Sequence, residues 1–338
     1  MTGGKVLLEV QDLKQWFPIK KGVLGRTVNH VKAVDGISFT IHEGETVSVV
    51  GESGCGKSTT GRSILRLVEP TSGKVLFDGV DLASLSKEEM RKKRKDVQII
   101  FQDPYASLNP RQTVFQILDE AMKIQGVGEN GNRRDKIKDL LQTVGLQEHQ
   151  IDLYPHQFSG GQRQRIGIAR ALSVRPKLIV CDEAVSALDV SIQAQVLNLL
   201  KDLQKKYNLT YLFISHDLGV VRHISDRIIV MYLGKIMEIN TKEGMFAEPG
   251  HPYTQALLSS IPSTNLDNQT ERIILTGDVP SPINPPKGCP FHTRCPHAYE
   301  RCQKDKPGYN YLGSDPYGEA VSSCHLVEDG RLVYPVVA

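Results

Sequence analysis

The sequence predicts an α/β fold, in which crossover helices cover a parallel sheet and a small loop-rich region follows. Short apolar runs typical of buried strands occur at Thr46 to Val50, Leu178 to Cys181 and Thr210 to Ile214. The last two runs are separated by a helical pattern from Ser191 to Tyr207, and this strand, helix, strand order predicts parallel strands. After about Glu248 the chain becomes rich in proline and polar residues, which indicates a linker and a loop-rich tail.

The length exceeds that of a usual single domain, so we expect two domains. The first covers residues 1–248 and includes a helical subdomain at about residues 104–172. Apolar residues recur at intervals of three and four between residues 115 and 172, which predicts that this stretch is mainly helical. The second covers residues 249–338 and carries most of the cysteines.

Turn and charge signals divide the first domain further. The pairs Asp35-Gly36 and Glu43-Gly44 indicate short strands before the buried one, and Ser72 to Gly79 has the pattern of a hairpin. Leu82 to Lys95 reads as a polar segment and a helix, and the basic run Arg91 to Lys95 within it is interpreted as a solvated helix face.

The composition is that of an ordinary soluble globular protein. Hydrophobic residues make up 40% of the 338 residues, charged residues 23%, and the formal net charge is +3. This balance gives no reason to expect a nucleic acid as partner. No apolar run approaches the roughly eighteen residues of a membrane-spanning helix, and the N-terminus lacks the apolar core of a signal peptide. We therefore expect a cytoplasmic protein whose membrane role, if it has one, is peripheral.

A glycine-rich segment follows the apolar run that ends at Val50. Residues 51–58 fit the pattern G-x-x-x-x-G-K-[ST], between a predicted strand and a helix that begins near Ser58. Glycines let backbone N–H groups wrap phosphate oxygens, so we expect Lys57 to reach the β- and γ-phosphates and Ser58 to ligate Mg²⁺. The predicted nucleotide-binding residues of this segment are Gly51, Ser53, Gly54, Cys55, Gly56, Lys57, Ser58 and Thr59.

Two carboxylates follow the apolar run Leu178 to Cys181. Asp182 and Glu183 are thereby placed at the carboxyl end of a buried strand, where ligands bind in open α/β sheets. We expect Asp182 to hold Mg²⁺ through water and Glu183 to polarise the attacking water.

A second glycine pair opens a predicted helix at Phe158-Ser159-Gly160-Gly161-Gln162. This segment resembles the signature of the ABC ATPase family, with Phe158 where leucine is commonest. The resemblance implies that Ser159, Gly160, Gly161 and Gln162 bind the γ-phosphate held by a partner subunit, so that dimerisation is part of the chemistry. It also implies a RecA-like P-loop ATPase core with an antiparallel β subdomain and a helical signature subdomain.

The other elements of that family follow in its order. Gln102 comes after the apolar run that ends at Phe101, Asp189 closes the segment after the carboxylates, and His216 follows Thr210 to Ser215. The resemblance implies that Gln102 senses Mg²⁺ and the membrane partner and that His216 contacts the γ-phosphate. For the aromatic side chain that stacks on adenine we choose Phe17 over Trp16.

Further stretches resemble the ATPases of oligopeptide/dipeptide permeases, over nearly the whole chain. They are residues 101–111, 183–193, 250–258 and 289–296, and the form Val-Ser-Ala-Leu-Asp at residues 185–189 favours the F-type member of the ATPase pair. Ala184 stands where proline is usual. The resemblance implies an ATPase that drives peptide import with a second ATPase subunit in a heterodimer, or a second copy of itself, and two integral membrane permease subunits. An extracytoplasmic peptide-binding protein is an indirect partner, and the expected location is the cytoplasmic face of the membrane.

Three alternatives remain to be weighed against this interpretation. A nickel importer would share these motifs. An ABC ATPase of DNA repair or translation would carry a long coiled-coil insertion, internal zinc modules or two cassettes, and only residues 104–158 separate Gln102 from the signature. A module that binds ATP without hydrolysing it is opposed by the presence of both Glu183 and His216.

Four of the six cysteines crowd into the last fifty residues, at Cys289, Cys295, Cys302 and Cys324. In a cytoplasmic protein this clustering indicates a metal rather than disulfides. The spacing C-x5-C-x6-C lacks the close pairs typical of structural zinc, and the family resemblance also points to iron and sulfur. We expect a [4Fe–4S] cluster, with Zn²⁺ as the alternative.

Overall fold

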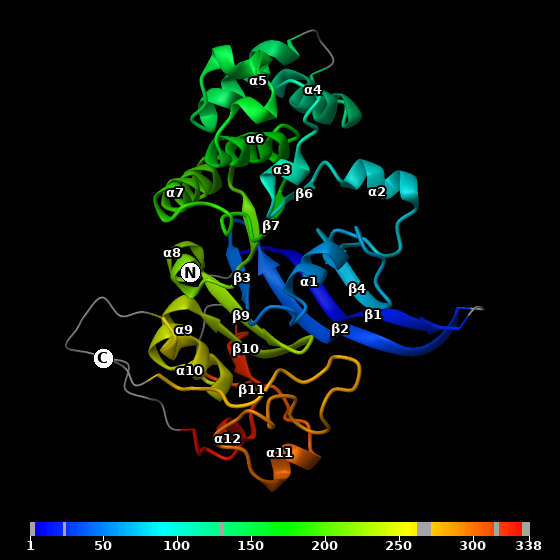
Figure 1. Ribbon diagram of the computed structural model, residues 1–338, viewed down its shortest axis with the longest axis vertical. Coiled ribbons are helices and arrows are strands. Elements are labelled where there is room, and N and C mark those ends of the chain that lie inside the picture. Colours follow the sequence, from blue (N-terminus) through cyan, green and yellow to red (C-terminus); the bar gives the residue numbers. More distant parts are fainter. Residues whose placement is uncertain (1–3, 23–24, 129–131, 262–271, 314–317, 333–338) are drawn as a thin grey trace, which may run out of the picture. The chain divides into compact units, whose positions relative to one another are not determined.

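The computed structural model describes residues 4–22, 25–128, 132–261, 272–313 and 318–332 (Figure 1). The chain divides into two compact units. Unit 1 comprises Met1–His42, Thr46–Ala83 and Ser215–Ala338, and unit 2 comprises Glu43–Glu45 and Ser84–Ile214.

Unit 1 contains a four-stranded antiparallel sheet with the order β2-β1-β4-β5. Its strands are β1 (Val6–Lys21), β2 (Arg26–His42), β4 (Ser72–Phe77) and β5 (Val80–Asp81). The predicted hairpin at residues 72–79 is confirmed as β4 and β5. The prediction of short strands before Thr46 is wrong, because β1 and β2 are 16 and 17 residues long. Several register shifts in their pairing interrupt the alternation from which strand length is estimated.

A second sheet of unit 1 has the order β11-β12-β10-β9-β3. These strands are β3 (Thr46–Val50), β9 (Arg227–Tyr232), β10 (Lys235–Thr241), β11 (Asn310–Tyr311) and β12 (Val321–Ser322). β3 and β9 are parallel, whereas β9 and β10 form an antiparallel hairpin. β12 comes from the C-terminal region and pairs with β10, so this region contributes two strands to the sheet of unit 1.

The helices of unit 1 are α1 (Lys57–Ile64), α8 (Leu218–Ile224), α9 (Lys242–Ala247), α10 (Pro252–Ser259), α11 (Glu300–Lys304) and α12 (His325–Glu328). One hydrophobic cluster joins this part of the unit. Tyr232 of β9, Tyr253 of α10, and Cys289, Phe291 and Cys302 of the C-terminal region are all buried in it. The C-terminal loops are therefore held by apolar packing against the strand β9, and they do not depend on a core of their own.

Unit 2 contains three parallel strands, β6 (Val97–Ile100), β7 (Leu178–Asp182) and β8 (Thr210–Ile214), in the order β8-β7-β6. The helix α7 (Val190–Tyr207) connects β7 to β8. The parallel strands and their crossover helix are as predicted. Every residue of β7 and β8 is buried, because both carry uninterrupted apolar runs.

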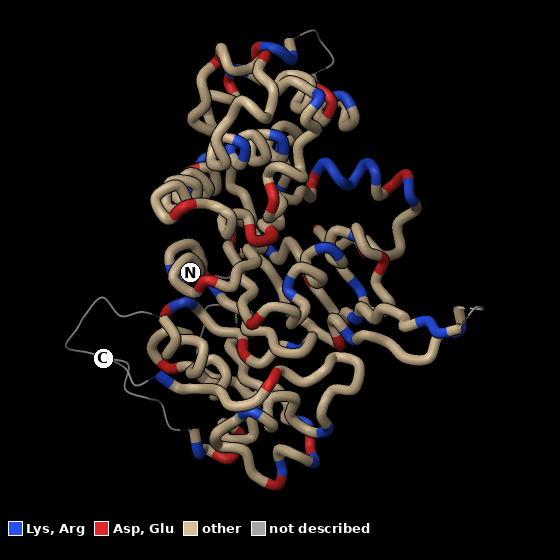
Figure 2. Tube along the Cα trace, viewed as in Figure 1, with Lys and Arg blue, Asp and Glu red and all other residues tan. Residues whose placement is uncertain are grey.

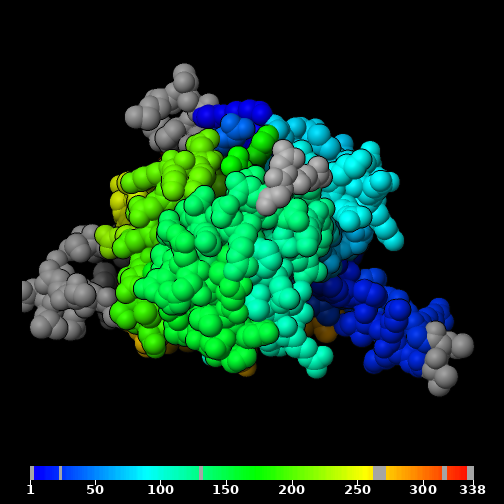
Figure 3. Space-filling model, turned by 90° about the horizontal axis from the view of Figure 1, so that it is seen from above, coloured from blue at the N-terminus to red at the C-terminus, as the bar shows by residue number. Residues whose placement is uncertain are grey.

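The remaining helices of unit 2 are α2 (Lys87–Lys93), α3 (Pro104–Ser107), α4 (Val114–Ile124), α5 (Arg133–Thr143) and α6 (Gly160–Leu172), with 3-10 turns at Glu148–Asp152 and Pro155–Gln157. The predicted helical character of residues 115–172 is confirmed, and much of this segment forms a continuous green surface in Figure 3. Basic residues run along α2 in Figure 2, and Arg91, Lys92 and Lys95 are exposed as expected for a solvated face. None of the helices in the described parts of the chain is long and apolar enough to span a membrane.

Candidate nucleotide site and cysteine-lined cavity

The glycine-rich segment 51–56 forms the loop between β3 and α1 in unit 1. Gly51 and Gly56 have φ values of 149° and 106°. A Cβ atom on Gly51 would lie 2.2 Å from the carbonyl oxygen of Met231, and one on Gly56 would lie 2.1 Å from that of Ala33. Only glycine allows the loop to approach these backbones so closely.

Lys57 is the first residue of α1 and is buried. Its Nζ donates to the carbonyl oxygen of Gly51 over 2.8 Å and to that of Glu52 over 3.1 Å. The ammonium group thus lies inside the curve of the loop, beside the N-terminus of α1, where an anion is favoured. Of the other predicted loop residues, Ser53 and Gly54 are exposed, Ser58 and Thr59 are half-buried and Cys55 is buried.

Two residues of unit 1 that sequence reasoning missed hold this loop at Glu52. The Arg294 guanidinium donates to both carboxylate oxygens of Glu52, over 2.7 Å and 3.1 Å. The hydroxyl oxygen of Tyr253 accepts the Glu52 N–H over 2.9 Å. The hydrogen bonds with Glu52 raise the pKa of Arg294 above its usual range, which keeps this side chain charged.

In unit 2, Asp182 and Glu183 lie at the carboxyl end of β7, and Gln102 follows the neighbouring strand β6. Gln102 Nε2 donates to Oε2 of Glu183 over 2.8 Å. Glu183 has a left-handed φ of 49°, a conformation that costs a non-glycine residue on the order of 1–3 kcal/mol. The structure thus brings the predicted base and Gln102 together, and the strain at Glu183 is typical of a functional position.

The predicted signature lies at the start of α6 in unit 2. Ser159 is the N-cap, where its Oγ accepts the Gln162 N–H over 3.3 Å and Gln162 Oε1 accepts the Ser159 N–H over 3.0 Å. A Cβ on Gly161 would lie 2.4 Å from Cγ2 of Ile192. Asp189 is exposed at the N-cap of α7. The residue pattern read as a phosphate cradle is therefore also a capping box that fixes the start of the helix.

The two remaining predicted residues, Phe17 and His216, lie in unit 1 and are exposed. Phe17 is 39% exposed on β1. Its neighbour Trp16 is engaged within the sheet, because its Nε1 donates to Asp35 and its ring lies under the Lys32 ammonium. Phe17 is therefore the better placed of the two to stack on a base.

A small cavity in unit 1 brings the four C-terminal cysteines together. It is lined by Cys289, Cys295, Cys302, Cys324, His251, Pro252, Phe291, His292, His297, His325 and Leu326. Burial raises the pKa of Cys289 to about 12 and that of Cys295 to about 11, and the neighbouring cysteines contribute to both shifts. Among the described residues, no three His, Cys, Asp or Glu side chains form a group that could hold a metal ion.

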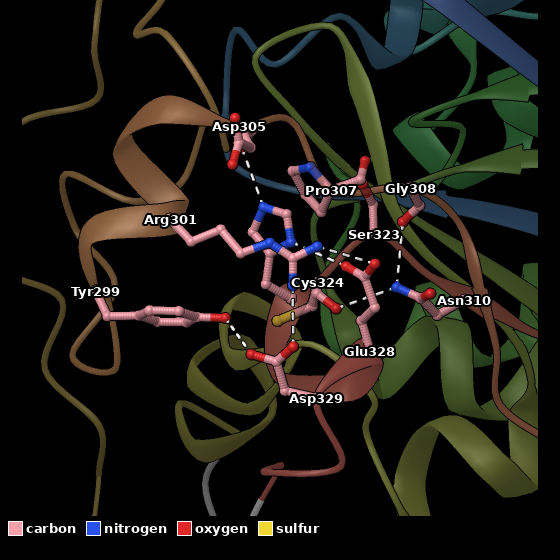
Figure 4. A network of polar contacts seen from close by, with 11 residues as sticks. Tyr299, Arg301, Asp305, Pro307, Gly308, Asn310, Ser323, Cys324, Glu328 and Asp329 are labelled. Carbon is pink, nitrogen blue, oxygen red and sulfur yellow. Dashed lines mark hydrogen bonds and ion pairs between the residues drawn. The ribbon is translucent and has the colours of Figure 1, made fainter.

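Ion pairs tie together the two helices that carry Cys302 and Cys324 (Figure 4). Arg301 of α11 pairs with Glu328 over 3.0 Å and with Asp329 over 2.9 Å, both at the end of α12. His325 makes hydrogen bonds with Glu328 through Nδ1 and with the Asp305 carbonyl through Nε2. Both ring nitrogens of His325 are thus engaged away from the cysteines.

Comparison with known families agrees with this geometry. Residues 34–186 match the ABC transporter family, and residues 237–302 match the oligopeptide/dipeptide transporter C-terminal region. The chain is 54% identical over 325 residues to the oligopeptide transport ATP-binding protein AppF of Bacillus subtilis, covering 95% of this chain and 98% of that protein. It is 56% identical over 301 residues to a putative peptide import ATP-binding protein of Brucella ovis, covering 89% and 93%.

Solved structures give the same result for the fold. A dimeric post-hydrolysis state of an ATP-binding cassette bound to ADP and Pi has a TM-score of 0.62 and 29% identity, and covers 70% of this chain and 99% of that one. CbiO1 of Clostridium perfringens, part of an ABC transporter complex, has a TM-score of 0.61 and 28% identity, with 72% and 92% covered. The chain therefore belongs to the ABC transporter family, among the oligopeptide and dipeptide transport ATP-binding proteins.

Proposed function

We propose that this chain is the ATP-hydrolysing subunit of a peptide importer. The observation that carries the hydrolytic part is the bond between Gln102 and the strained Glu183 at the end of β7. The glycine-rich loop with buried Lys57 supports nucleotide binding. The substrate class rests on the family match of residues 237–302 and on the names of the relatives.

Each residue of the site has a distinct role in this proposal. Lys57 and the backbone N–H groups from Gly51 to Thr59 would bind the phosphates, while Ser58, Asp182 and Gln102 would hold Mg²⁺, which would offset phosphate charge. Glu183 orients and polarises the attacking water, and Gln102 fixes the direction of the Glu183 carboxylate.

A second subunit completes the site in this mechanism. The N-terminus of α6, with Ser159, Gly160, Gly161 and Gln162, would bind the γ-phosphate of a nucleotide held by the partner, beside Asp189. The capping box supports this role because it fixes the helix start without using the N–H groups of Gly160 and Gly161. His216 would contact the γ-phosphate and Phe17 would stack on adenine. The ADP- and Pi-bound relative is dimeric, which also supports a dimer here.

The proposed assembly includes partners outside this chain. We propose an ATPase domain at residues 1–248 and a C-terminal domain at residues 249–338, with a related ATPase as the dimer partner. Two membrane permease subunits would dock on the helical part of the ATPase domain at the cytoplasmic face of the membrane. An extracytoplasmic binding protein would deliver the peptide.

The cysteine-lined cavity offers thiol ligands from four positions of the C-terminal region. Four sulfur side chains around one cavity fit the donor set of a [4Fe–4S] cluster. We propose that Cys289, Cys295, Cys302 and Cys324 hold this cluster, which would supply a structural crosslink between α11 and α12.

Isolation from its native membrane tests the transport role. The full-length chain should co-purify with two integral membrane proteins and a second ATPase, and peptide-loaded binding protein should stimulate the ATPase of that complex. Stimulation by DNA or ribosomes, without membrane partners, would overturn the proposal. Nickel uptake without peptide uptake would identify the alternative substrate. A tight ATP-dependent homodimer with full activity alone would exclude the heterodimer.

A further inference from the structure

Glu52, the second residue of the phosphate loop, is held at three points. Its carboxylate accepts two hydrogen bonds from Arg294, its N–H donates to Tyr253 and its carbonyl oxygen accepts from Lys57. Both the side chain and the peptide groups of this residue are therefore restrained.

The two distant partners of Glu52 come from the C-terminal half of unit 1, where they are themselves fixed. The Arg294 side chain is only 8% exposed and directly precedes Cys295. Tyr253 is fully buried, with its ring 4.9 Å from that of Tyr232 and 5.2 Å from that of Phe291. Neither residue can follow a displaced loop without disturbing this packing.

The hydrogen bonds of Glu52 with Arg294 and Tyr253 are strong and directional. A fork of two parallel hydrogen bonds between guanidinium and carboxylate fixes angle as well as distance. The Tyr253 hydroxyl satisfies a backbone N–H that faces the protein interior. Lys57, the phosphate-binding side chain, shares the carbonyl of the same restrained residue, so movement of Glu52 would also move the ammonium group.

We infer that Arg294 and Tyr253 are positioning residues for nucleotide binding, and that through Glu52 they set the conformation of the phosphate loop. The inference rests on the proposed ATPase function. It gives the C-terminal region a part in the nucleotide site in addition to any part in metal binding. The sequence segments that carry the two residues, 250–258 and 289–296, thus act on a loop about 200 residues earlier in the chain.

The test is titration of the purified full-length chain with the fluorescent analogue MANT-ATP and Mg²⁺. Arg294→Gln and Glu52→Gln should each weaken binding about tenfold, and the double variant should bind no more weakly than either single variant. Tyr253→Phe removes only the acceptor oxygen and should weaken binding by a similar factor. Arg294→Lys keeps the charge but loses the fork, and should restore only part of the affinity.

Two controls separate positioning from loss of folding. The thermal unfolding midpoint of each variant without nucleotide should stay within a few degrees of that of the wild type. Arg66→Gln removes a comparable fork, from Arg66 to Glu69, that lies outside the phosphate loop, and should leave MANT-ATP affinity unchanged. Unchanged affinity in the Arg294 and Tyr253 variants, or additive losses in the double variant, would overturn this inference but not the ATPase proposal. Failure of the wild type to bind MANT-ATP would overturn the ATPase proposal as well.

Discussion

Gln102 Nε2 lies 2.8 Å from Oε2 of Glu183, although 81 residues separate them in the sequence. The two residues follow neighbouring parallel strands, β6 and β7, and this pairing brings them to the same edge of the sheet. Ser186 closes the arrangement, because its Oγ donates to the Glu183 carbonyl over 3.0 Å. Gln102 therefore orients the carboxylate of Glu183, and Ser186 holds its backbone.

Glu183→Gln should abolish turnover and leave ATP binding intact. The variant removes the group that polarises water, but neither the phosphate loop nor Asp182. We expect the rate of phosphate release to fall at least about a hundredfold, with MANT-ATP affinity unchanged and, in the presence of the second ATPase subunit, a closed ATP-bound dimer accumulating on gel filtration. Near wild-type hydrolysis would show that Glu183 is not the general base.

Gln102→Glu should shift the pH dependence of hydrolysis upward. Two carboxylates about 3 Å apart cannot both ionise easily, so the variant pair keeps one shared proton to a higher pH than a lone carboxylate would. We expect kcat at pH 7 to fall about tenfold and to recover as the pH approaches 9. Gln102→Ala is the matched control, because it should lower kcat without moving the profile. Identical pH profiles for the two variants would contradict the contact.

The buried strands and the glycine-rich loop could be predicted from local sequence. Thr46–Val50 and Thr210–Ile214 form strands with the predicted limits, because an uninterrupted apolar run between turn signals has few other ways to be buried. The glycine-rich loop is also predictable, because a strand pattern, a glycine pattern and a helix pattern follow one another directly in the chain. The prediction failed at β1, where the left-handed Asp12 and several register shifts break the alternating pattern.

Anaerobically purified protein should contain iron and acid-labile sulfide, and Cys302→Ser should lose most of both. The serine oxygen is a poorer ligand than a thiolate, and the α11 ligand would be missing. Cys181→Ser is the control, because Cys181 is buried in β7 of unit 2 and should be irrelevant to the metal content. Colourless wild-type protein with stoichiometric zinc and no sulfide would overturn the cluster, and the same variant would then release zinc.

Glu238→Gln should stabilise the protein at high pH. Burial raises the pKa of Glu238 from 4.5 to about 7, and the buried His251, whose pKa is lowered to about 3, stays neutral and cannot compensate a charge. Between pH 4.5 and about pH 7 the Glu238 carboxyl group keeps its proton in the folded chain but has lost it in the unfolded chain. The contribution of the protonated Glu238 to the free energy of unfolding is therefore complete below about pH 4.5, and the wild type loses it as the pH rises through about 7.

Glutamine cannot ionise, and its carbonyl can still accept the Gly250 N–H that Glu238 Oε1 accepts over 2.8 Å. We expect the thermal midpoint of Glu238→Gln to match that of the wild type near pH 5 and to exceed it by several degrees at pH 8. Glu300→Gln, which changes an exposed carboxylate on α11, should show no such difference. A shift of equal size at both pH values would contradict the assignment.

The link between Glu52 and Arg294 could not have been predicted from the sequence. The residues are 242 positions apart, and a charged pair leaves no periodic pattern in the chain. The sequence predicts a linker and a loop-rich tail after about Glu248. It could not indicate that Phe291 and Cys302 pack on Tyr232, since burial against a distant strand depends on the tertiary fold.

The pairing of β12 with β10 also bears on solubility. β10 would otherwise present a row of open backbone groups, and such a row can recruit a strand from another molecule. β12 pairs with Glu238 and Ile239 in the middle of that row, and β11 pairs with β12, so the sheet ends in strands of two residues that are too short to template further pairing. A chain truncated after Thr241 would expose β10 over seven residues, and intermolecular strand exchange and aggregation are the expected consequences.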